Sequence, residues 1–188
     1  MEFSDFIAPF DAASFRTQYF GKLPLHIRND GGNRPSLLPW SRFNEVLAIT
    51  PYWNEETLKV YFKSRAALRE NYCDMTDVRA GVSAPVNPAK VKALMGLGAS
   101  LVANHVHRVC PEVGAVANVL EREFAARVAA NVYCSFRGVQ AFQTHFDLHD
   151  VFAVQTAGEK VWRVYESRAD APVLPPESLH ARTRLAKQ

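Results

Sequence analysis

Residues 129–167 contain the pattern that most limits how this chain can fold. Three strand-like stretches follow one another there, at 129–136, 145–155 and 160–167. The tight turn expected at Ala157–Glu159 predicts that the last two stretches form a hairpin. Helical spacing dominates the first two thirds of the chain instead. The sequence therefore predicts an α+β, β-rich fold in a single domain, with a helix-rich region over 1–128 and a sheet region over 129–188.

Weaker signals place individual elements in the first 128 residues. Helices are expected from Asp11 as a cap, from Ser41 as a cap, and from Pro88 and Pro111 as first residues. The remaining signals predict strands, at 23–27, 57–63 and 100–106. Helices and short strands are therefore expected to alternate before the sheet region begins.

Composition excludes several classes of protein. Apolar residues make up 48% of the 188 residues and charged residues 22%, which is ordinary for a globular domain with a core. The net charge of +3 is too small to predict direct nucleic-acid binding. No apolar run has the length of a membrane span, and the N-terminus MEFSDFIAPFD lacks the blocks of a signal peptide. Because of the missing span, no membrane binding is expected. The three cysteines form no CxxC motif, so a reduced, cytoplasmic protein is expected.

The stretch THFDLHD places His145 and Asp147 two residues apart, which on a strand puts both on one face. An imidazole, a carboxylate and the imidazole of a second, distant histidine together form the set of three ligands that holds Fe(II). This set leaves coordination positions of the metal open for a co-substrate and oxygen. A hydrogen-bonded polar strand end is the more common explanation of such a pair. His149 continues the row about 13 Å further along, too far to share the ion, and is expected to face the interior or a substrate pocket. His105 and His107 show the same spacing but are expected to be satisfied histidines.

Residues 131–166 as a whole resemble the JmjC-type cupin oxygenases, and most closely the bacterial cupin-like group related to the ribosomal-protein hydroxylases. Matching residues occur in the order that this family shows: Asn131, Tyr133, Gly138, His145, Asp147, Asp150–Phe152, Gly158, Lys160 and Trp162–Arg163. Weaker similarity at 23–29 and 100–124 extends the resemblance over most of the chain. It implies a double-stranded β-helix (jelly-roll) core. Phe152 and Trp162 are expected to be core residues.

The resemblance also implies a site. His145 and Asp147 would be two ligands of Fe(II), and Lys160 would bind the distal carboxylate of 2-oxoglutarate. Tyr133 would assist that carboxylate, and Asn131 would line the site. Without the resemblance, Lys160 would be expected in solvent after a turn, and Tyr133 would be a half-buried strand tyrosine.

The chain departs from the family after Tyr165. The family's second histidine lies in a Pro-Gly-x-x-His segment, which this sequence lacks, and His180 lies in a predicted helix start instead. A jelly roll needs eight strands, whereas residues 129–188 supply three, so the barrel is expected to be incomplete. Three explanations remain open: the chain is a fragment, a second chain or copy completes the barrel as in a homodimer, or the cupin is degenerate.

The resemblance implies an Fe(II)- and 2-oxoglutarate-dependent dioxygenase that hydroxylates a protein or peptide side chain. The alternative is a non-catalytic cupin-fold binding or dimerisation module that has lost the complete metal triad. A metal cupin that does not use 2-oxoglutarate is a third reading.

Overall fold

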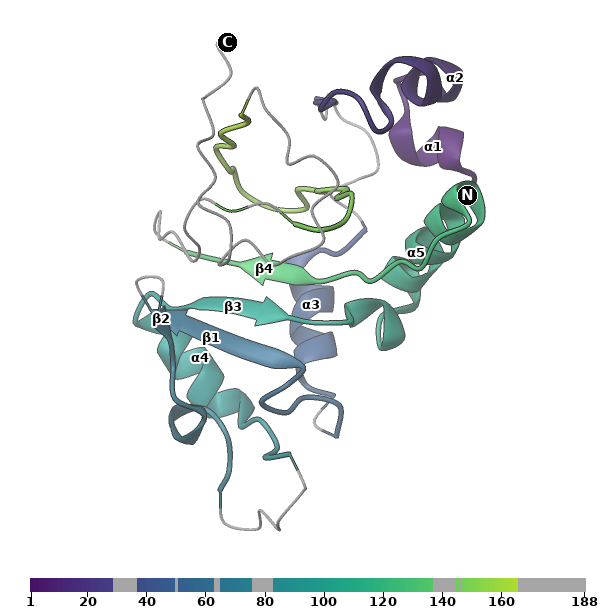
Figure 1. Cartoon of the computed structure of the whole chain (residues 1–188). Helices are drawn as coiled ribbons and strands as arrows, with labels where there is room; N and C mark the ends of the chain where they lie inside the picture. Colours follow the sequence, from purple (N-terminus) through teal and green to yellow (C-terminus); the bar gives the residue numbers. More distant parts are fainter. Residues whose placement is uncertain are drawn as a thin grey trace. The chain divides into compact units, whose positions relative to one another are not determined.

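The computed structural model describes residues 1–28, 37–49, 51–62, 65–75, 83–136, 145 and 147–165 (Figure 1). The chain divides into two units. The sheet unit comprises Met1–Phe3 and Leu37–Gln143, and the second unit comprises Ser4–Ser36 and Thr144–Gln188. None of the described helices is long and apolar enough to cross a bilayer.

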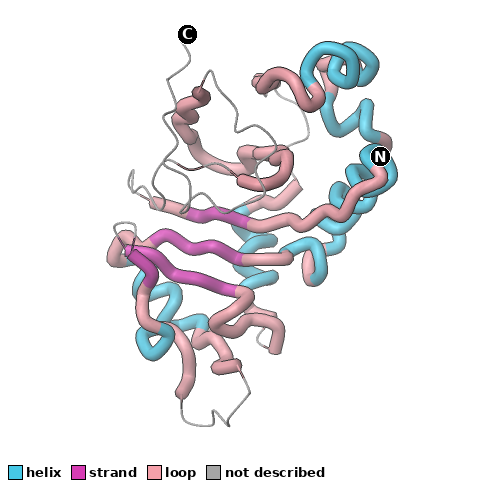
Figure 2. Tube along the Cα trace, viewed as in Figure 1, coloured by secondary structure: helices cyan, strands magenta, loops and turns pink. Residues whose placement is uncertain are grey.

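The sheet unit is built on four antiparallel strands in the order β2-β1-β3-β4 (Figure 2). Their bounds are β1 Leu58–Phe62, β2 Arg65–Ala66, β3 Ser100–Ala103 and β4 Val132–Cys134. β3 lies at the centre and pairs with β1 on one side and β4 on the other, so the sheet joins segments that are distant in the sequence. The strands predicted at 57–63, 100–106 and 129–136 are confirmed, each over a shorter length.

One face of this sheet carries the core. Leu58 lies opposite Ala103, and Val60 lies opposite Leu101, which in turn pairs with Cys134. The helices α3 (Trp40–Leu47) and α4 (Pro88–Gly96) lie on this face (Figure 1) and contribute apolar side chains to the same buried cluster. Side chains on a strand alternate between faces, so the intervening residues point to the other face of the sheet.

The helix starts follow local chemistry. α4 and α5 (Pro111–Phe124) begin at the predicted prolines, whose missing N–H costs nothing in the first turn. The Asn87 side chain caps α4 by accepting from the N–H groups of Ala89 and Lys90 at 3.0 and 3.1 Å. The cap predicted at Ser41 is wrong, because α3 begins one residue earlier, at Trp40, and the extended residue before it is Pro39. The described residues of this unit also form the short 3₁₀ helices η3 (Arg69–Asn71) and η4 (Val106–Arg108).

The second unit contains short helices from the N-terminal region. α1 spans Phe3–Ile7, α2 spans Ala12–Ser14, and a π-helical turn, η1, spans Phe15–Tyr19. Asp11 caps α2 as predicted, since its carboxylate accepts from the Ser14 N–H at 2.7 Å. The strand predicted at 23–27 is wrong, because these residues have no strand partner in the structure and form no regular element.

The strands predicted at 145–155 and 160–167 are also wrong for the part of them that the structure describes. Residue 145 and residues 147–165 contain no strand, apart from a single bridge residue at Tyr165. The chain does bend at Ala157 and Gly158, and Gly158 adopts a left-handed φ of 68°. Alternation selects the side of a strand that can be buried, but the strand itself exists only where a neighbour completes its hydrogen bonds. The described residues therefore form an open antiparallel sheet with helices packed on it, and this sheet does not close into a barrel.

Candidate functional site

Tyr133 lies in β4 opposite Val102, on the sheet face that points away from the core, and its side chain is 56% exposed. Tyr61 of β1 points to the same face. Burial, and secondly the proximity of Tyr133, raise the pKa of the Tyr61 hydroxyl. Further along this face the Ser135 hydroxyl donates to Oγ of Ser100 at 2.7 Å. The second face of the sheet therefore presents a set of hydroxyl groups around the predicted site tyrosine.

Sequence reasoning named only Tyr133 from this set. The alternation of TLKVYFK over residues 57–63 was the signal that could have found Tyr61, because it places Tyr61 on the polar side of the strand. Ser100 has no such signal, since every residue of β3 is buried.

Asn131 precedes β4 and holds a neighbouring turn. Its Oδ1 accepts from the N–H of His105 at 3.0 Å, and His105 adopts the uncommon left-handed conformation with φ of 55°. The Ala130 carbonyl accepts from the Val106 N–H at 2.8 Å in the same corner. Asn131 thus fixes the backbone between β3 and η4 to the start of β4, and its role towards a co-substrate stays a prediction.

The two histidines of this corner differ. Nδ1 of His107 accepts a hydrogen bond from the Ala130 N–H at 3.1 Å, so His107 has a partner, as expected. This hydrogen bond requires a neutral imidazole ring that carries its proton on Nε2. Burial lowers the pKa of His107. Nδ1 of His105 is buried and has no hydrogen-bond partner within the described residues, so the expectation that His105 is satisfied is wrong.

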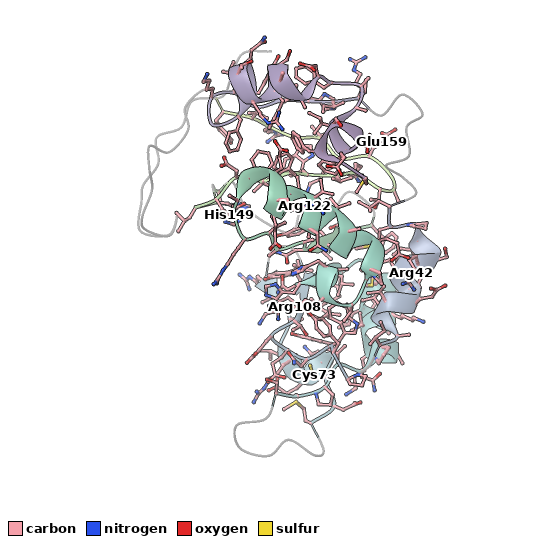
Figure 3. All side chains as sticks on the ribbon, turned by 90° about the vertical axis from the view of Figure 1, so that its right-hand side faces the viewer. Arg42, Cys73, Arg108, Arg122, His149 and Glu159 are labelled. Carbon is pink, nitrogen blue, oxygen red and sulfur yellow. The ribbon has the colours of Figure 1, made fainter. Side chains whose placement is uncertain are left out.

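His145 and Asp147 lie in the second unit, in a stretch of irregular backbone, and both side chains are exposed. His149 is exposed as well (Figure 3), so it does not face an interior, and its alternative placement in a substrate pocket stays a prediction. Across the described ranges no three His, Cys, Asp or Glu side chains converge as a metal-binding group. His180 falls outside those ranges.

Lys160 lies beyond the Gly158 bend, and its side chain is exposed, as expected for a lysine after a turn. Nζ of Lys160 lies 4.3 Å from the centroid of the Trp162 ring, within the range of a cation–π interaction. The prediction that Trp162 is a core residue is wrong, because its side chain is 54% exposed. The Trp162 ring instead packs against the Lys160 ammonium group.

The five predicted site residues therefore form two sets. Asn131 and Tyr133 are neighbours at the start of β4 in the sheet unit. His145, Asp147 and Lys160 belong to the second unit. The first set has defined hydrogen-bonding partners or strand register, whereas the second is carried by an irregular segment.

Comparison with known proteins gives the context of these residues. Residues 105–186 match the JmjC domain family. The bifunctional lysine-specific demethylase and histidyl-hydroxylase NO66 of Dictyostelium discoideum is 27% identical over 172 residues, covering 92% of this chain and 32% of that protein. Ribosomal oxygenase 1 of Gallus gallus is 27% identical over 176 residues, covering 90% of this chain and 27% of that protein. Ribosomal oxygenase 1 of Danio rerio is 44% identical over 59 residues, covering 31% of this chain and 11% of that protein.

The chain spans 32% or less of the length of these curated relatives. The matched family segment nevertheless includes all five predicted site residues, from Asn131 to Lys160. The resemblance derived from residues 131–166 is thereby confirmed, since the JmjC match and the similarity to NO66 and ribosomal oxygenase 1 support a JmjC cupin-type oxygenase family.

Proposed function

We propose that this chain supplies part of an Fe(II)- and 2-oxoglutarate-dependent oxygenase that hydroxylates a protein or peptide side chain. Residues 129–188 would form the first half of the jelly roll, and residues 1–128 would form the region that packs on it. The observation that carries the proposal is the order of His145, Asp147 and Lys160 within the segment that matches the JmjC domain.

The donor chemistry of His145 and Asp147 fits ferrous iron. An imidazole nitrogen and a carboxylate oxygen are two of the three donors of the facial set used by iron oxygenases. Both side chains are exposed, so they are open to an ion from solution. Among the residues that the structure describes, no third donor converges with this pair. When bound, ferrous iron would supply the activation of dioxygen that is coupled to oxidative decarboxylation of 2-oxoglutarate.

The chain's own residues would bind and orient the co-substrate. The Lys160 ammonium would form a charge-assisted hydrogen bond with the distal carboxylate of 2-oxoglutarate. Trp162 limits the directions that this ammonium samples, because the cation lies on its ring. The Tyr133 hydroxyl would donate a second hydrogen bond to the same carboxylate, with Asn131 lining the site.

The substrate class that we propose for this chain is inferred by analogy from the names of its relatives. Their names describe a histidyl-hydroxylase, a lysine-specific demethylase and a ribosomal oxygenase. All of these names refer to chemistry on protein side chains or on the ribosome. A protein or peptide side chain is therefore the substrate that we propose for this chain.

A thermal titration with Mn(II) and 2-oxoglutarate tests the proposal without turnover. A ligand pair at one hundred times its dissociation constant should stabilise the protein by about 2.7 kcal/mol. His145→Ala should abolish this stabilisation, while His149→Ala, an equally exposed histidine four residues along, should retain it. Lys160→Ala should lose the contribution of 2-oxoglutarate and keep that of the metal. A metal cupin without 2-oxoglutarate would show no effect of Lys160→Ala.

The exposed apolar side chains of the second unit favour the alternative, a binding or dimerisation module. Val151 is 59% exposed and Val161 is 90% exposed, which leaves apolar surface for a partner. If wild type shows no stabilisation by metal and co-substrate and light scattering gives the mass of a dimer, this alternative replaces the oxygenase.

A further inference from the structure

The second unit joins the N-terminal helices to the segment that follows the His145–Asp147 pair. Residues 4–36 and 144–188 cluster together, although residues 37–143 separate them in the sequence. The described part of the later segment, residue 145 and residues 147–165, has no helix and no strand ladder to hold it. Side-chain contacts with the N-terminal helices are therefore of interest for its conformation.

Phe152 makes the packing contacts that connect the two segments. Its ring centroid lies 6.1 Å from that of Phe6, in an edge-to-face arrangement, and 6.0 Å from that of Phe15. Phe15 is 8% exposed, and Phe152 is half-buried. Phe20 extends the cluster, with its ring centroid 6.1 Å from that of Phe15. Aromatic pairs at these distances stabilise beyond the area that they bury.

The helical turns fix the position of Phe15. The Phe20 N–H donates to the Phe15 carbonyl at 2.9 Å, which is the hydrogen bond of a π-helical turn. This wider turn brings Phe20 over Phe15, whereas a regular α-helix would place residues five apart on different faces. Asp11 caps the start of these turns, and Gly21, with a φ of 68°, ends them. The two phenylalanines are therefore held on a defined scaffold.

We propose that Phe15, together with Phe6, positions the segment that carries His145 and Asp147 by holding Phe152. Phe15 is then a positioning residue, since it acts through Phe152 and not on the ion. The part of this inference that concerns metal binding rests on the proposed function. Metal ligands on a loosely held segment lose affinity, because binding must first order the backbone that carries them.

Hydrogen exchange of the full chain tests the packing claim independently of any metal. Phe15→Ala should accelerate amide exchange about tenfold over residues 147–155, the loss of protection expected from one well-packed ring, while β1 and β3 stay unchanged. The matched control is Phe10→Ala, which removes a ring from the same helical region that packs on Tyr19 at 5.2 Å. Phe15→Leu, which keeps an apolar side chain, should give an intermediate acceleration and covers the case in which Phe15→Ala does not fold.

Mn(II) binding, followed by the electron paramagnetic resonance signal of the free ion, provides the second measurement. The dissociation constant should rise about tenfold in Phe15→Ala and remain at the wild-type value in Phe10→Ala. Unchanged exchange over 147–155 in the Phe15 variants would overturn the inference, and so would an equal acceleration in Phe10→Ala. Faster exchange in Phe15→Ala, combined with a wild type that binds no Mn(II), would support the positioning role and remove the proposed function.

Discussion

Strand β1 and residues 160–165 have similar sequence patterns and different structures. Both are rich in β-branched and aromatic residues, as LKVYF and KVWRVY, and the first also alternates between apolar and polar positions. In β1, Leu58 and Val60 are each 1% exposed, and strands pair on both sides. In the later segment Val161 is 90% exposed and the described residues form no ladder. Strand-like composition therefore does not suffice, and the presence of neighbouring strands decides whether a strand forms.

The two regions should respond very differently to loss of a tryptophan. Trp53 in the sheet unit is 1% exposed, and its Nε1–H donates to the Val46 carbonyl at 2.8 Å. Trp53→Ala should lower the free energy of unfolding by about 3–5 kcal/mol, through the cavity and the lost hydrogen bond. Trp162→Ala in the exposed segment should lower it by less than about 1 kcal/mol. Urea denaturation measures both, and equal losses would break the contrast between the regions.

Packing tightness within the sheet unit can be tested with two glycines. A Cβ at Gly114 of α5 would lie 2.9 Å from the carbonyl oxygen of His107, which is backbone and cannot move away easily. Gly114→Ala should destabilise by about 1–3 kcal/mol. Gly96→Ala is the control, since a Cβ there meets nothing within 4 Å and alanine favours the helix. Similar stability of the two variants would show that α5 is not packed tightly on η4.

A smaller effect of pH is expected at the corner before β4. The Ala130 N–H needs an unprotonated Nδ1 on His107, and burial lowers the pKa of His107 below the unfolded value of about 6.5. The unfolded chain therefore binds more protons, so this contribution is complete above about pH 6.5 and is lost as the pH falls through the folded pKa. The loss should be about 1 kcal/mol, the net value of one hydrogen bond.

The measurement is urea denaturation of wild type and His107→Gln between pH 5 and 8. The variant should show a weaker dependence on pH over the lower part of this range. An identical dependence in both proteins would assign the effect to other groups. The described residues of the second unit contain no hydrogen bond like the one between His107 and Ala130. This unit should therefore not contribute to the difference in pH dependence between the two proteins.

Local signals predicted the sheet unit well. The prolines at 88 and 111 mark helix starts, and the alternation at 57–63 marks a strand, because the residues that decide these elements are within a few positions of them. The failures at 23–27, 145–155 and 160–167 share a cause. Each of these stretches needs a partner strand that local sequence does not specify.

The sequence predicted which residues belong to the candidate site better than it predicted how their side chains are arranged. The motif pointed to the JmjC resemblance and to the residue types of His145, Asp147 and Lys160, and the JmjC match over residues 105–186 confirms that resemblance. It did not give the cation–π contact between Lys160 and Trp162, or the use of Asn131 to hold His105. Those contacts depend on which backbone groups are left unpaired nearby, and this follows from the fold and not from the motif.

Direct titration of Mn(II) in the presence of 2-oxoglutarate tests the central proposal, that the segment around residue 147 holds the metal. We expect wild type to bind the ion and Asp147→Asn to bind it at least about tenfold more weakly, since a carboxylate ligand is lost. Asp150→Asn, an exposed carboxylate three residues along, should bind as wild type does. Equal affinity of wild type and Asp147→Asn would contradict the account.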